Sequence, residues 1–522
     1  MKPSPSGPRN LFTHKKMAKI HKYWSRKPWN LMEYEIQKNT LIGDTVLDPF
    51  CGSGSVGLEA VLAGRNFIGY DLNPFAISLS KSTLNKSFDI LLFDKSLELI
   101  IEANKTEIMK LYEHNSNYVL YTIPGKSNKK DYNIVLCDEH FKKIGNIYDP
   151  GLEVEFGSGN IAGICIPDAD FPSRFNKDRF SYKGVKRVSD LFSSRNLIAL
   201  SFLKDSIEKL PEQVKPDFSL ILTNTLLHVS KLKSENIRPL GVNNYWIPDD
   251  FIEENVLWRF IDRAKQFRLA KIEIADRFQV ANEFSAASAE LICESSIPLS
   301  SIDSNSIDYI LTDPPYGDVI QYSELSFVWN IWLGTPQNSK EELIVNPAQD
   351  KDEKYFLDQL GLFLEECFRV LKDNKKLTLC FQNKDPNIWF EVAKAARDSG
   401  FAFSNIETFD FLGSTFNKNW SGKSPKVDIY LTLLKSTETN LDSKVVIKRT
   451  LRNSLEGFNF EKDGKLVEHV NDRFSLAIAI GIVEIFNGIQ LEDSSIKEIN
   501  RFILTEPEEE ALREEDQQPT LF

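Results

Sequence analysis

The stretch Thr45-Val-Leu-Asp-Pro-Phe-Cys-Gly-Ser-Gly-Ser55 constrains the fold most, because an apolar segment runs directly into a glycine-rich turn. Its first residues are β-branched or apolar and predict the end of a buried strand. Pro49 ends that strand, because proline cannot donate a hydrogen bond to a sheet. The two glycines predict a tight turn whose backbone can approach a ligand closely, and residues 55–63 predict a helix. This order predicts an α/β fold that binds a nucleoside at the carboxyl edge of a sheet.

A second predicted strand, residues 66–70, ends at Asp71. An acidic side chain about twenty residues after a glycine turn is placed to accept hydrogen bonds from ribose hydroxyls. The chain lacks both the full GxGxxG pattern and the Walker lysine at this turn. The expected ligand is therefore a nucleoside, not NAD and not ATP held by its phosphates.

Residues 306–312 predict another buried strand, and Asp313-Pro-Pro-Tyr316 follows at its carboxyl end. The two loops together resemble the signature pair of the DNA amino-methyltransferases, a D-P-F-x-G-S-G loop at 48–54 and a [DNS]-P-P-[YFW] loop at 313–316. The resemblance extends to residues 321–329 and to His21-Lys-Tyr-Trp-Ser-Arg-Lys-Pro28. Family members methylate exocyclic nitrogens of DNA bases. Joint occurrence of both motifs on predicted strands makes the resemblance specific.

The resemblance implies a Rossmann-like, seven-stranded class I methyltransferase sheet and S-adenosylmethionine as the methyl donor. Asp71 is expected to bind the ribose, and the glycine loop to meet the methionine part. The expected cofactor-binding residues are Asp48, Pro49, Phe50, Gly52, Gly54, Asp71, Asn73 and Tyr23.

The expected catalytic residues are Asp313, Pro314, Pro315 and Tyr316. An exocyclic amine is a poor nucleophile, because its lone pair is delocalised into the base. Asp313 can accept one N–H of that amine and the Pro314 carbonyl the other, while Tyr316 stacks on the base. The base must leave the duplex to reach such a pocket. Aspartate at the first position favours adenine N6 over cytosine N4.

Bulk properties are those of a globular protein, with 522 residues, 42% hydrophobic and 26% charged. This length predicts two or three domains. Six cysteines do not predict a disulfide framework. No segment reads as an export signal or a membrane span, so a cytoplasmic protein without a membrane partner is expected. The net charge of −12 disfavours nucleic acid, but much of it lies in residues 506–516.

The third strand of the sheet is expected at 289–293, far beyond the dozen or so residues that a crossover needs. Residues 84–284 are therefore predicted to be an inserted module for target recognition, within a catalytic domain of residues 1–83 and 285–437. Inside the insert we expect helices at 97–112, 188–210, 218–232 and 251–267, and strands at 118–123 and 132–137. Residues 438–522 are expected to form a helical carboxyl-terminal appendage with an acidic disordered tail.

DNA contacts are predicted in two basic and aromatic stretches, residues 171–187 and 413–425. Basic side chains neutralise phosphates and aromatic ones stack on bases. The second stretch corresponds to a loop that touches the extruded base in relatives. The candidate DNA-binding residues are Arg174, Arg179, Lys186, Arg187, Phe416 and Trp420.

Metal binding is not expected. In the early insert only Cys137, His140 and Cys165 are available, without a CxxC pair, whereas a structural zinc site needs four ligands.

Three other functions remain open. A tRNA guanine-N2 methyltransferase uses a nearly identical Asp-Pro-Pro-Tyr-Gly loop, and an N4-cytosine DNA methyltransferase shares the architecture. A non-catalytic DNA-binding subunit of a defence complex would keep the fold alone, although the intact Asp313 and Tyr316 argue against this. A restriction or defence partner is suggested by the resemblance, whereas the recognition sequence and the oligomeric state cannot be deduced.

Overall fold

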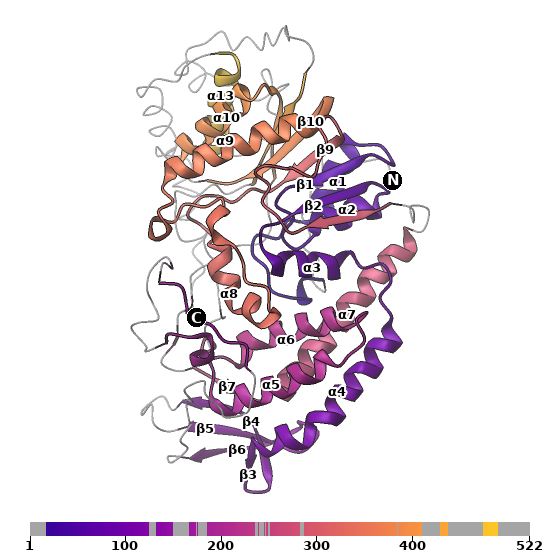
Figure 1. Cartoon of the computed structure of the whole chain (residues 1–522), viewed down its shortest axis with the longest axis vertical. Coiled ribbons are helices and arrows are strands. Elements are labelled where there is room, and N and C mark those ends of the chain that lie inside the picture. The colour runs from indigo at the N-terminus through magenta and orange to yellow at the C-terminus, as the bar shows by residue number, and fades with distance from the viewer. Residues whose placement is uncertain are drawn as a thin grey trace, which may run out of the picture.

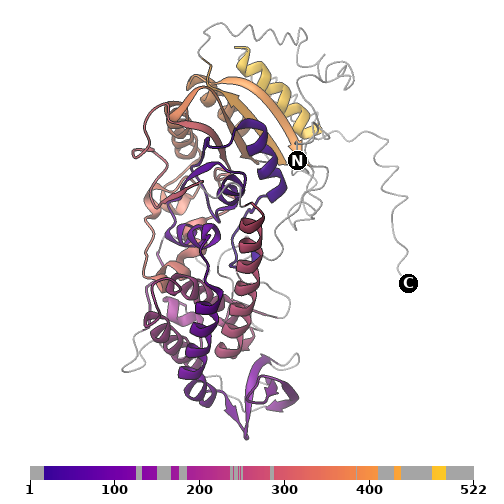
Figure 2. The same ribbon diagram turned by 90° about the vertical axis from the view of Figure 1, so that its right-hand side faces the viewer.

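The computed structural model describes residues 17–124, 132–149, 166–173, 175, 185–234, 239, 245, 247–248, 251–281, 287–383, 385–409, 428–436 and 473–488. The molecule is elongated, with a seven-stranded sheet at one end, a smaller antiparallel sheet at the other and long helices between them (Figure 1). Figure 2 shows the narrow side of this arrangement.

The large sheet has the strand order β11-β12-β10-β9-β1-β2-β8. Its strands are β1 (Thr45–Asp48), β2 (Asn66–Tyr70), β8 (Ala289–Ile292), β9 (Ile307–Thr312), β10 (Leu371–Phe381), β11 (Ala402–Phe409) and β12 (Asp428–Leu434). Only β12 runs antiparallel to both of its neighbours, while the other neighbouring pairs are parallel. The predicted seven-stranded α/β sheet is confirmed, and the expected third strand is β8.

Both faces of this sheet are covered, because successive side chains of a strand point to opposite faces. Val46 and Tyr309 belong to the apolar core on one face, whereas Leu47 and Ile310 belong to the core on the other. The first face carries α1 (Trp29–Asn39), α2 (Ser55–Leu62) and α3 (Pro74–Leu84). The second carries α9 (Glu353–Val370), α10 (Pro386–Asp398) and α13 (Arg473–Phe486).

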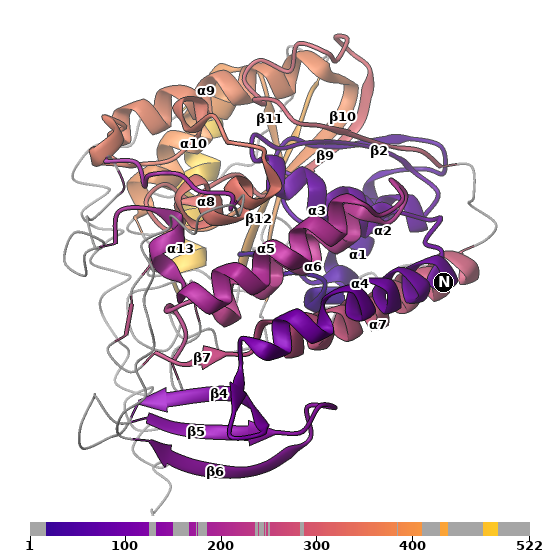
Figure 3. The same ribbon diagram turned by 60° about the horizontal axis from the view of Figure 1, so that its bottom comes forward.

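The segment between α3 and β8 contributes four long helices and the small sheet. The helices are α4 (Ile90–Lys110), α5 (Ser194–Glu208), α6 (Lys215–Val229) and α7 (Val256–Val280). The small sheet has the order β3-β4-β5-β6, and β7 pairs with β4. Its strands are β3 (Glu113–His114), β4 (Asn117–Pro124), β5 (Tyr132–Cys137), β6 (Lys143–Asp149) and β7 (Glu253–Glu254). Figure 3 shows the helices between this sheet and the large one.

One apolar core joins these helices to α1, α2 and α3. Within it, the ring of Phe93 on α4 stacks on Phe218 of α6 and Phe267 of α7, with centroid distances of 4.8 and 5.9 Å. The segment that the sequence marks as an insertion is therefore packed against the first face of the large sheet and shares its core.

Two helices of this segment differ from expectation. The helix expected at 188–210 is divided into the 3-10 helix η3 (Val188–Leu191) and α5, because the Ser193 side chain caps α5 by accepting a hydrogen bond from the Asn196 N–H. The helix expected at 251–267 starts later and runs longer, because Glu253 and Glu254 pair with β4 as β7. Strand β6 was not expected.

Helix α8 (Tyr322–Leu333) follows β9 and lies between the large sheet and the helices of the insert (Figure 1). The loop after α8 contains two short 3-10 helices, η5 (Ser339–Glu341) and η6 (Pro347–Gln349). Asn346 fixes this loop by donating to the side-chain oxygens of Gln321 and Glu324, at 2.8 and 2.7 Å. None of the helices within the described ranges is long and apolar enough to cross a bilayer.

Candidate active site

A cleft of about 930 Å³ opens at the carboxyl ends of β1, β2 and β9. Strands β1 and β9 are parallel neighbours, with Val46 paired to Tyr309, so the loops that follow them lie side by side. Nine of the twelve predicted cofactor and catalytic residues line it: Tyr23, Asp48, Pro49, Phe50, Gly52, Asp71, Asn73, Asp313 and Pro315.

The glycine turn after β1 needs its glycines. Gly52 and Gly54 have positive φ angles of 52° and 76°, a region that L side chains adopt at a cost. A Cβ on Gly54 would lie 3.0 Å from Ser80 Oγ, so Gly54 supports the turn from behind the cleft. A Cβ on Gly52 would lie 2.8 Å from the Tyr23 ring, which places Tyr23 directly over the turn.

Asp71 ties the end of β2 to the glycine turn. One carboxylate oxygen accepts the Gly52 N–H at 2.9 Å and the other accepts the Asn73 N–H at 2.9 Å. Burial raises the pKa of Asp71 to about 6, and the two backbone hydrogen bonds moderate the rise. Each oxygen has a second lone pair, so the carboxylate can still accept hydrogen bonds from two hydroxyls of a ligand.

Asp48 joins the tips of β1 and β9. Its Oδ1 accepts the Phe50 N–H at 3.1 Å and the Thr312 hydroxyl at 2.8 Å. Burial raises the pKa of Asp48 to about 7, against the effect of these hydrogen bonds. This carboxylate therefore orients the glycine turn relative to the Asp-Pro-Pro-Tyr loop.

The Asp-Pro-Pro-Tyr loop forms a three-membered polar cluster with Lys27. The Tyr316 hydroxyl donates to Asp313 Oδ1, and Lys27 Nζ lies 3.2 Å from Asp313 Oδ2. Lys27 also donates to the Tyr316 hydroxyl at 2.7 Å. Burial raises the pKa of Asp313 to about 6, while the charge of Lys27 opposes the rise.

The remaining catalytic candidates do not line the cleft. The Tyr316 ring packs edge-on against Phe381, with a centroid distance of 5.7 Å. Pro314 is buried behind the loop, whereas Pro315 faces the cleft. Asp71 and Asp313 thus share one cleft, and Tyr316 reaches it through its hydrogen bond to Asp313.

Asn73 lies between the cleft and α8. Its side-chain oxygen caps α3 by accepting the Phe75 N–H at 3.1 Å and also accepts from Asn330 Nδ2 at 2.9 Å. Its amide nitrogen donates to Ser326 Oγ at 3.0 Å. The side chain of this predicted cofactor-binding residue is thus used to join α3 to α8.

Residues 17–28, here named the amino-terminal segment, cross the cleft and rest on α6 and α8. His21 is fully buried, with Nε2 3.2 Å from Thr223 Oγ1 and its ring 4.7 Å from that of Trp329. Burial lowers the pKa of His21 to about 3, so the ring is neutral. Trp24 stacks on the same Trp329 at 5.2 Å. These contacts hold Tyr23 and Lys27 at the cleft wall.

None of the predicted DNA-binding residues that the structure describes lines this cleft. Arg187 is ion-paired with Asp168 at 2.7 Å and with Asp170 at 3.3 Å, and Lys186 is exposed beside it. Arg174, Arg179, Phe416 and Trp420 lie outside the described residues, as do residues 438–472 and 489–522 with the acidic tail. Within the described ranges no group of three or more His, Cys, Asp or Glu could hold a metal ion.

Sequence reasoning missed several residues of the cleft. Lys27 carried a signal, because it lies in the family-like segment His21–Pro28, but the sequence alone gave it no specific role. Tyr322 lies in the family-like residues 321–329 but was given no role. Four residues in the loop after α8 carried no pattern of their own: Gln337, Glu341, Glu342 and Leu343.

The cleft is acidic. Among the described residues that line it, five carry carboxylates and two carry cations: Asp48, Asp71, Asp313, Glu341 and Glu342 against Arg26 and Lys27. Such a surface attracts a ligand with positive charge and repels phosphate groups. A nucleoside that carries a cationic group fits it better than a nucleotide.

The sheet and the cleft define the class of the protein. Six strands run in one direction, and the seventh, β12, is reversed between β10 and β11. The cleft opens at the end of β1, where the strand order continues to β2 on one side and to β9 on the other. This is the class I methyltransferase fold.

Comparison with known proteins narrows the class. Residues 6–82 match a family model described as DNA methylase. The type II methyltransferase M.MjaII of Methanocaldococcus jannaschii is 25% identical over 219 residues, which are 40% of this chain and 38% of the relative. M.MthZI of Methanothermobacter thermautotrophicus is 33% identical over 91 residues, 17% of this chain and 24% of the relative. M2.LlaDCHI of Lactococcus lactis subsp. cremoris is 40% identical over 65 residues, 12% of this chain and 24% of the relative.

These matches span between 24% and 38% of the length of those three relatives. The matched segment contains the glycine turn and Asp71, the two features that form one wall of the cleft. The matched part of this chain is therefore similar to DNA methylases.

Proposed function

We propose that this protein is an S-adenosylmethionine-dependent methyltransferase that methylates an exocyclic amino group of a DNA base, with adenine N6 as its target. One observation carries the proposal. The ribose-type carboxylate Asp71 and the catalytic-type carboxylate Asp313 line a single cleft, at the ends of strands separated only by β1. A donor held by the first can therefore meet an amine held by the second.

The cleft fits the donor. When bound, S-adenosylmethionine supplies a methyl group activated by a sulfonium. Asp71 would bind the ribose hydroxyls, and the Gly52 backbone would lie against the methionine part under the Tyr23 ring. The excess of carboxylates in the lining suits the positive charges of the sulfonium and the ammonium.

The amine is prepared by the Asp-Pro-Pro-Tyr loop. Asp313 accepts one N–H and the Pro314 carbonyl the other, which localises the nitrogen lone pair and directs it along the cleft. As the nitrogen gains the methyl carbon, the carbon–sulfur bond of the donor would break and its electron pair would stay on sulfur, which leaves a neutral thioether. The nitrogen loses one proton, and the ionised Asp313 is an acceptor at that place. The Tyr316 ring stacks on the base once its hydroxyl leaves Asp313.

Target choice and domain roles extend the proposal. Aspartate at position 313 supports adenine over cytosine, and the base would be extruded from duplex DNA to enter the cleft. We assign residues 1–83 and 285–437 to catalysis and residues 84–284 to target recognition, because the insert packs against α3 and α8 at the cleft. The relatives are named type II methyltransferases, which supports a role in restriction-modification beside a restriction partner.

The test is methyl transfer from tritiated donor by the full chain, with duplex DNA or tRNA as substrate, followed by nucleoside analysis. Label in N6-methyladenine supports the proposal. Label in N4-methylcytosine or in N2-methylguanine would show that the target is cytosine N4 or guanine N2 instead of adenine N6. No label in either nucleic acid would reject the proposed activity.

The Asp313→Asn variant tests the site itself. It keeps the size of the side chain but removes the charge that holds the amine, so we expect a rate loss of at least about a hundredfold. Asp318→Asn is the matched control, because Asp318 is exposed five positions along the same loop. Equal rates for Asp313→Asn and the parent would contradict the assignment of the cleft.

A further inference from the structure

Lys27 is placed unlike an ordinary surface lysine. Its side chain is 10% exposed. Its ammonium contacts both polar residues of the Asp-Pro-Pro-Tyr loop, at 3.2 Å from Asp313 Oδ2 and 2.7 Å from the Tyr316 hydroxyl. The ammonium also lies over the Tyr316 ring, 5.4 Å from its centroid. Because Tyr316 donates to Oδ1, both oxygens of Asp313 are occupied by donors.

Several acidic or neutral groups face Asp313 from the elements around it. Asp428 of β12 raises the pKa of Asp313, and the charge of Asp313 in turn raises the pKa of Asp48 on β1. The other titratable groups near the cluster are Tyr322, Cys380 and Tyr430. Burial lowers the pKa of Lys27, but the charges of Asp313 and Asp428 outweigh burial and raise it overall, so the side chain is an ammonium ion.

The backbone around Lys27 holds the ammonium in place. Pro28 follows it directly and precedes α1, which restricts the backbone on that side. Arg26 donates to the His21 carbonyl at 2.8 Å, and His21 is fixed between α6 and α8. The amino-terminal segment therefore delivers a positive charge to one defined carboxylate oxygen.

We propose that Lys27 is a positioning residue for methyl transfer, which keeps the Asp313 carboxylate ionised and oriented into the cleft. The proposal rests on the function proposed above. An entering amine replaces the Tyr316 hydroxyl at Oδ1, while Lys27 remains at Oδ2. The carboxylate can thus exchange one donor for another without rotating, and it stays a hydrogen-bond acceptor although burial favours its neutral form.

The alternative is a purely structural ion pair, and a pH profile separates the two. We would measure methyl transfer to duplex DNA between about pH 5 and pH 9 for the parent, Lys27→Met, Lys27→Arg and the control Lys19→Met. Lys19 lies in the same segment but is exposed. Donor binding by equilibrium dialysis and thermal unfolding accompany each variant.

For Lys27→Met we expect the acidic limb of the rate profile to move up by about one pH unit, with about a tenfold loss of rate on that limb. Lys27→Arg should return the limb towards that of the parent, because it restores the charge. Donor affinity should change by less than about threefold, since the ammonium contacts the catalytic loop. An acidic limb at the same pH in Lys27→Met and the parent would overturn the proposal, whatever the loss of rate.

A direct titration keeps the two proposals separate. Difference infrared spectroscopy of the parent against Asp313→Asn isolates the Asp313 carboxyl band and needs no turnover. Its midpoint should rise in the Lys27→Met background if Lys27 keeps Asp313 ionised, even if DNA is not the substrate. An unchanged midpoint rejects the role of Lys27, whereas a shifted midpoint in a protein that methylates neither DNA nor tRNA rejects only the proposed reaction. If Lys27→Met does not fold, Lys27→Gln gives the same comparison.

Discussion

The buried acids of the cleft and those of strand β7 in the insert have opposite kinds of partner. In the cleft, Asp48 and Asp71 accept hydrogen bonds from backbone N–H groups and a hydroxyl. Burial raises their pKa values to about 7 and about 6. These carboxylates line the cleft and keep unused acceptor capacity there.

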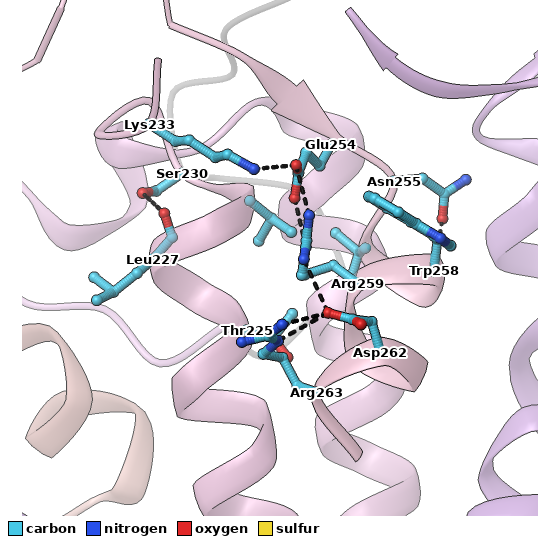
Figure 4. A network of polar contacts seen from close by, with 12 residues as sticks. Thr225, Leu227, Ser230, Lys233, Glu254, Asn255, Trp258, Arg259, Asp262 and Arg263 are labelled. Carbon is cyan, nitrogen blue, oxygen red and sulfur yellow. Dashed lines mark hydrogen bonds and ion pairs between the residues drawn. The ribbon is translucent and has the colours of Figure 1, made fainter. Parts of the chain in front are cut away.

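On β7 of the insert, the buried acids Glu253 and Glu254 are matched with cations. Figure 4 shows Glu254 of β7 held by Lys233 and by Arg259, whose Nε lies 2.6 Å from Glu254 Oε2. Arg259 also bonds Asp262 at 2.9 Å, and Arg263 completes the network. Burial raises the pKa of Asp262, but the arginines outweigh it and lower the value overall.

The difference separates acids that serve a ligand from acids that serve the fold. A buried carboxylate paired with guanidinium groups has its charge and its lone pairs satisfied, so it fixes one arrangement of the chain. A buried carboxylate without such a partner costs free energy unless a ligand supplies the positive charge. Asp313 is intermediate, because Lys27 compensates its charge but leaves it at the cleft wall.

The comparison is tested most strongly in the insert. Glu254→Gln leaves Lys233 and Arg259 without their shared carboxylate, and we expect the free energy of unfolding to fall by about 3 kcal/mol. Chemical denaturation measures this fall. Donor affinity should remain that of the parent, and a weakened donor affinity in the folded variant would erase the distinction between the two groups of acids.

The cleft should respond in the opposite way. Asp71→Asn removes the charge that would bind the ribose hydroxyls in the function proposed above, which we expect to weaken donor binding about 10- to 100-fold. Equilibrium dialysis with labelled donor measures the affinity. Stability in the absence of donor should fall less than in Glu254→Gln, because the loss of a buried charge offsets part of the cost of leaving one of the two backbone N–H groups unpaired. Asp318→Asn controls for the change of net charge.

The dependence of stability on pH gives a further test of the buried acids in the cleft. Because the folded-state pKa of Asp48 is about 7, above the ordinary value for aspartate, its protonated form stabilises the fold. That contribution is complete below about pH 4 and is lost as the pH rises through about 7. Melting temperatures measured across this window should fall less for Asp48→Asn than for the parent. Parallel curves would show that Asp48 ionises normally.

The smallest effect is expected at the surface. Lys110 and Glu107 form an ion pair at 2.8 Å, but their side chains are 61% and 60% exposed. Water and side-chain entropy cancel most of such an attraction, so Glu107→Gln should change the free energy of unfolding by no more than about 0.5 kcal/mol. Chemical denaturation of Glu107→Gln and Glu254→Gln in parallel compares the two losses of unfolding free energy. Equal losses in the two variants would contradict the role given to burial.

Much of the sheet was predictable, because a buried strand can be recognised from its own short run of apolar and β-branched residues. Thr45–Asp48 and Ile307–Thr312 are apolar runs that end in Asp-Pro, and the glycine turn needs its positive φ angles whatever surrounds it. The cleft followed from these two loops, because the carboxyl ends of parallel strands meet at one edge of the sheet.

What could not be predicted depends on partners far away in the chain. Lys27 meets Tyr316 across 289 positions, so its local context gave only its charge. Strand β7 is two glutamates long, and nothing local marks Glu253–Glu254 as a strand. Its structure comes from pairing with β4 and from the cations that neutralise it.

The anchoring of the amino-terminal segment has a consequence for synthesis on the ribosome. His21 cannot make its contact with Thr223 until 202 more residues have been synthesised, and Lys27 cannot make its hydrogen bond until Tyr316 has been synthesised. The amino-terminal segment is therefore synthesised well before the residues that fix it in place. The cleft wall that contains Lys27 and Asp313 cannot form until residue 316 has been translated.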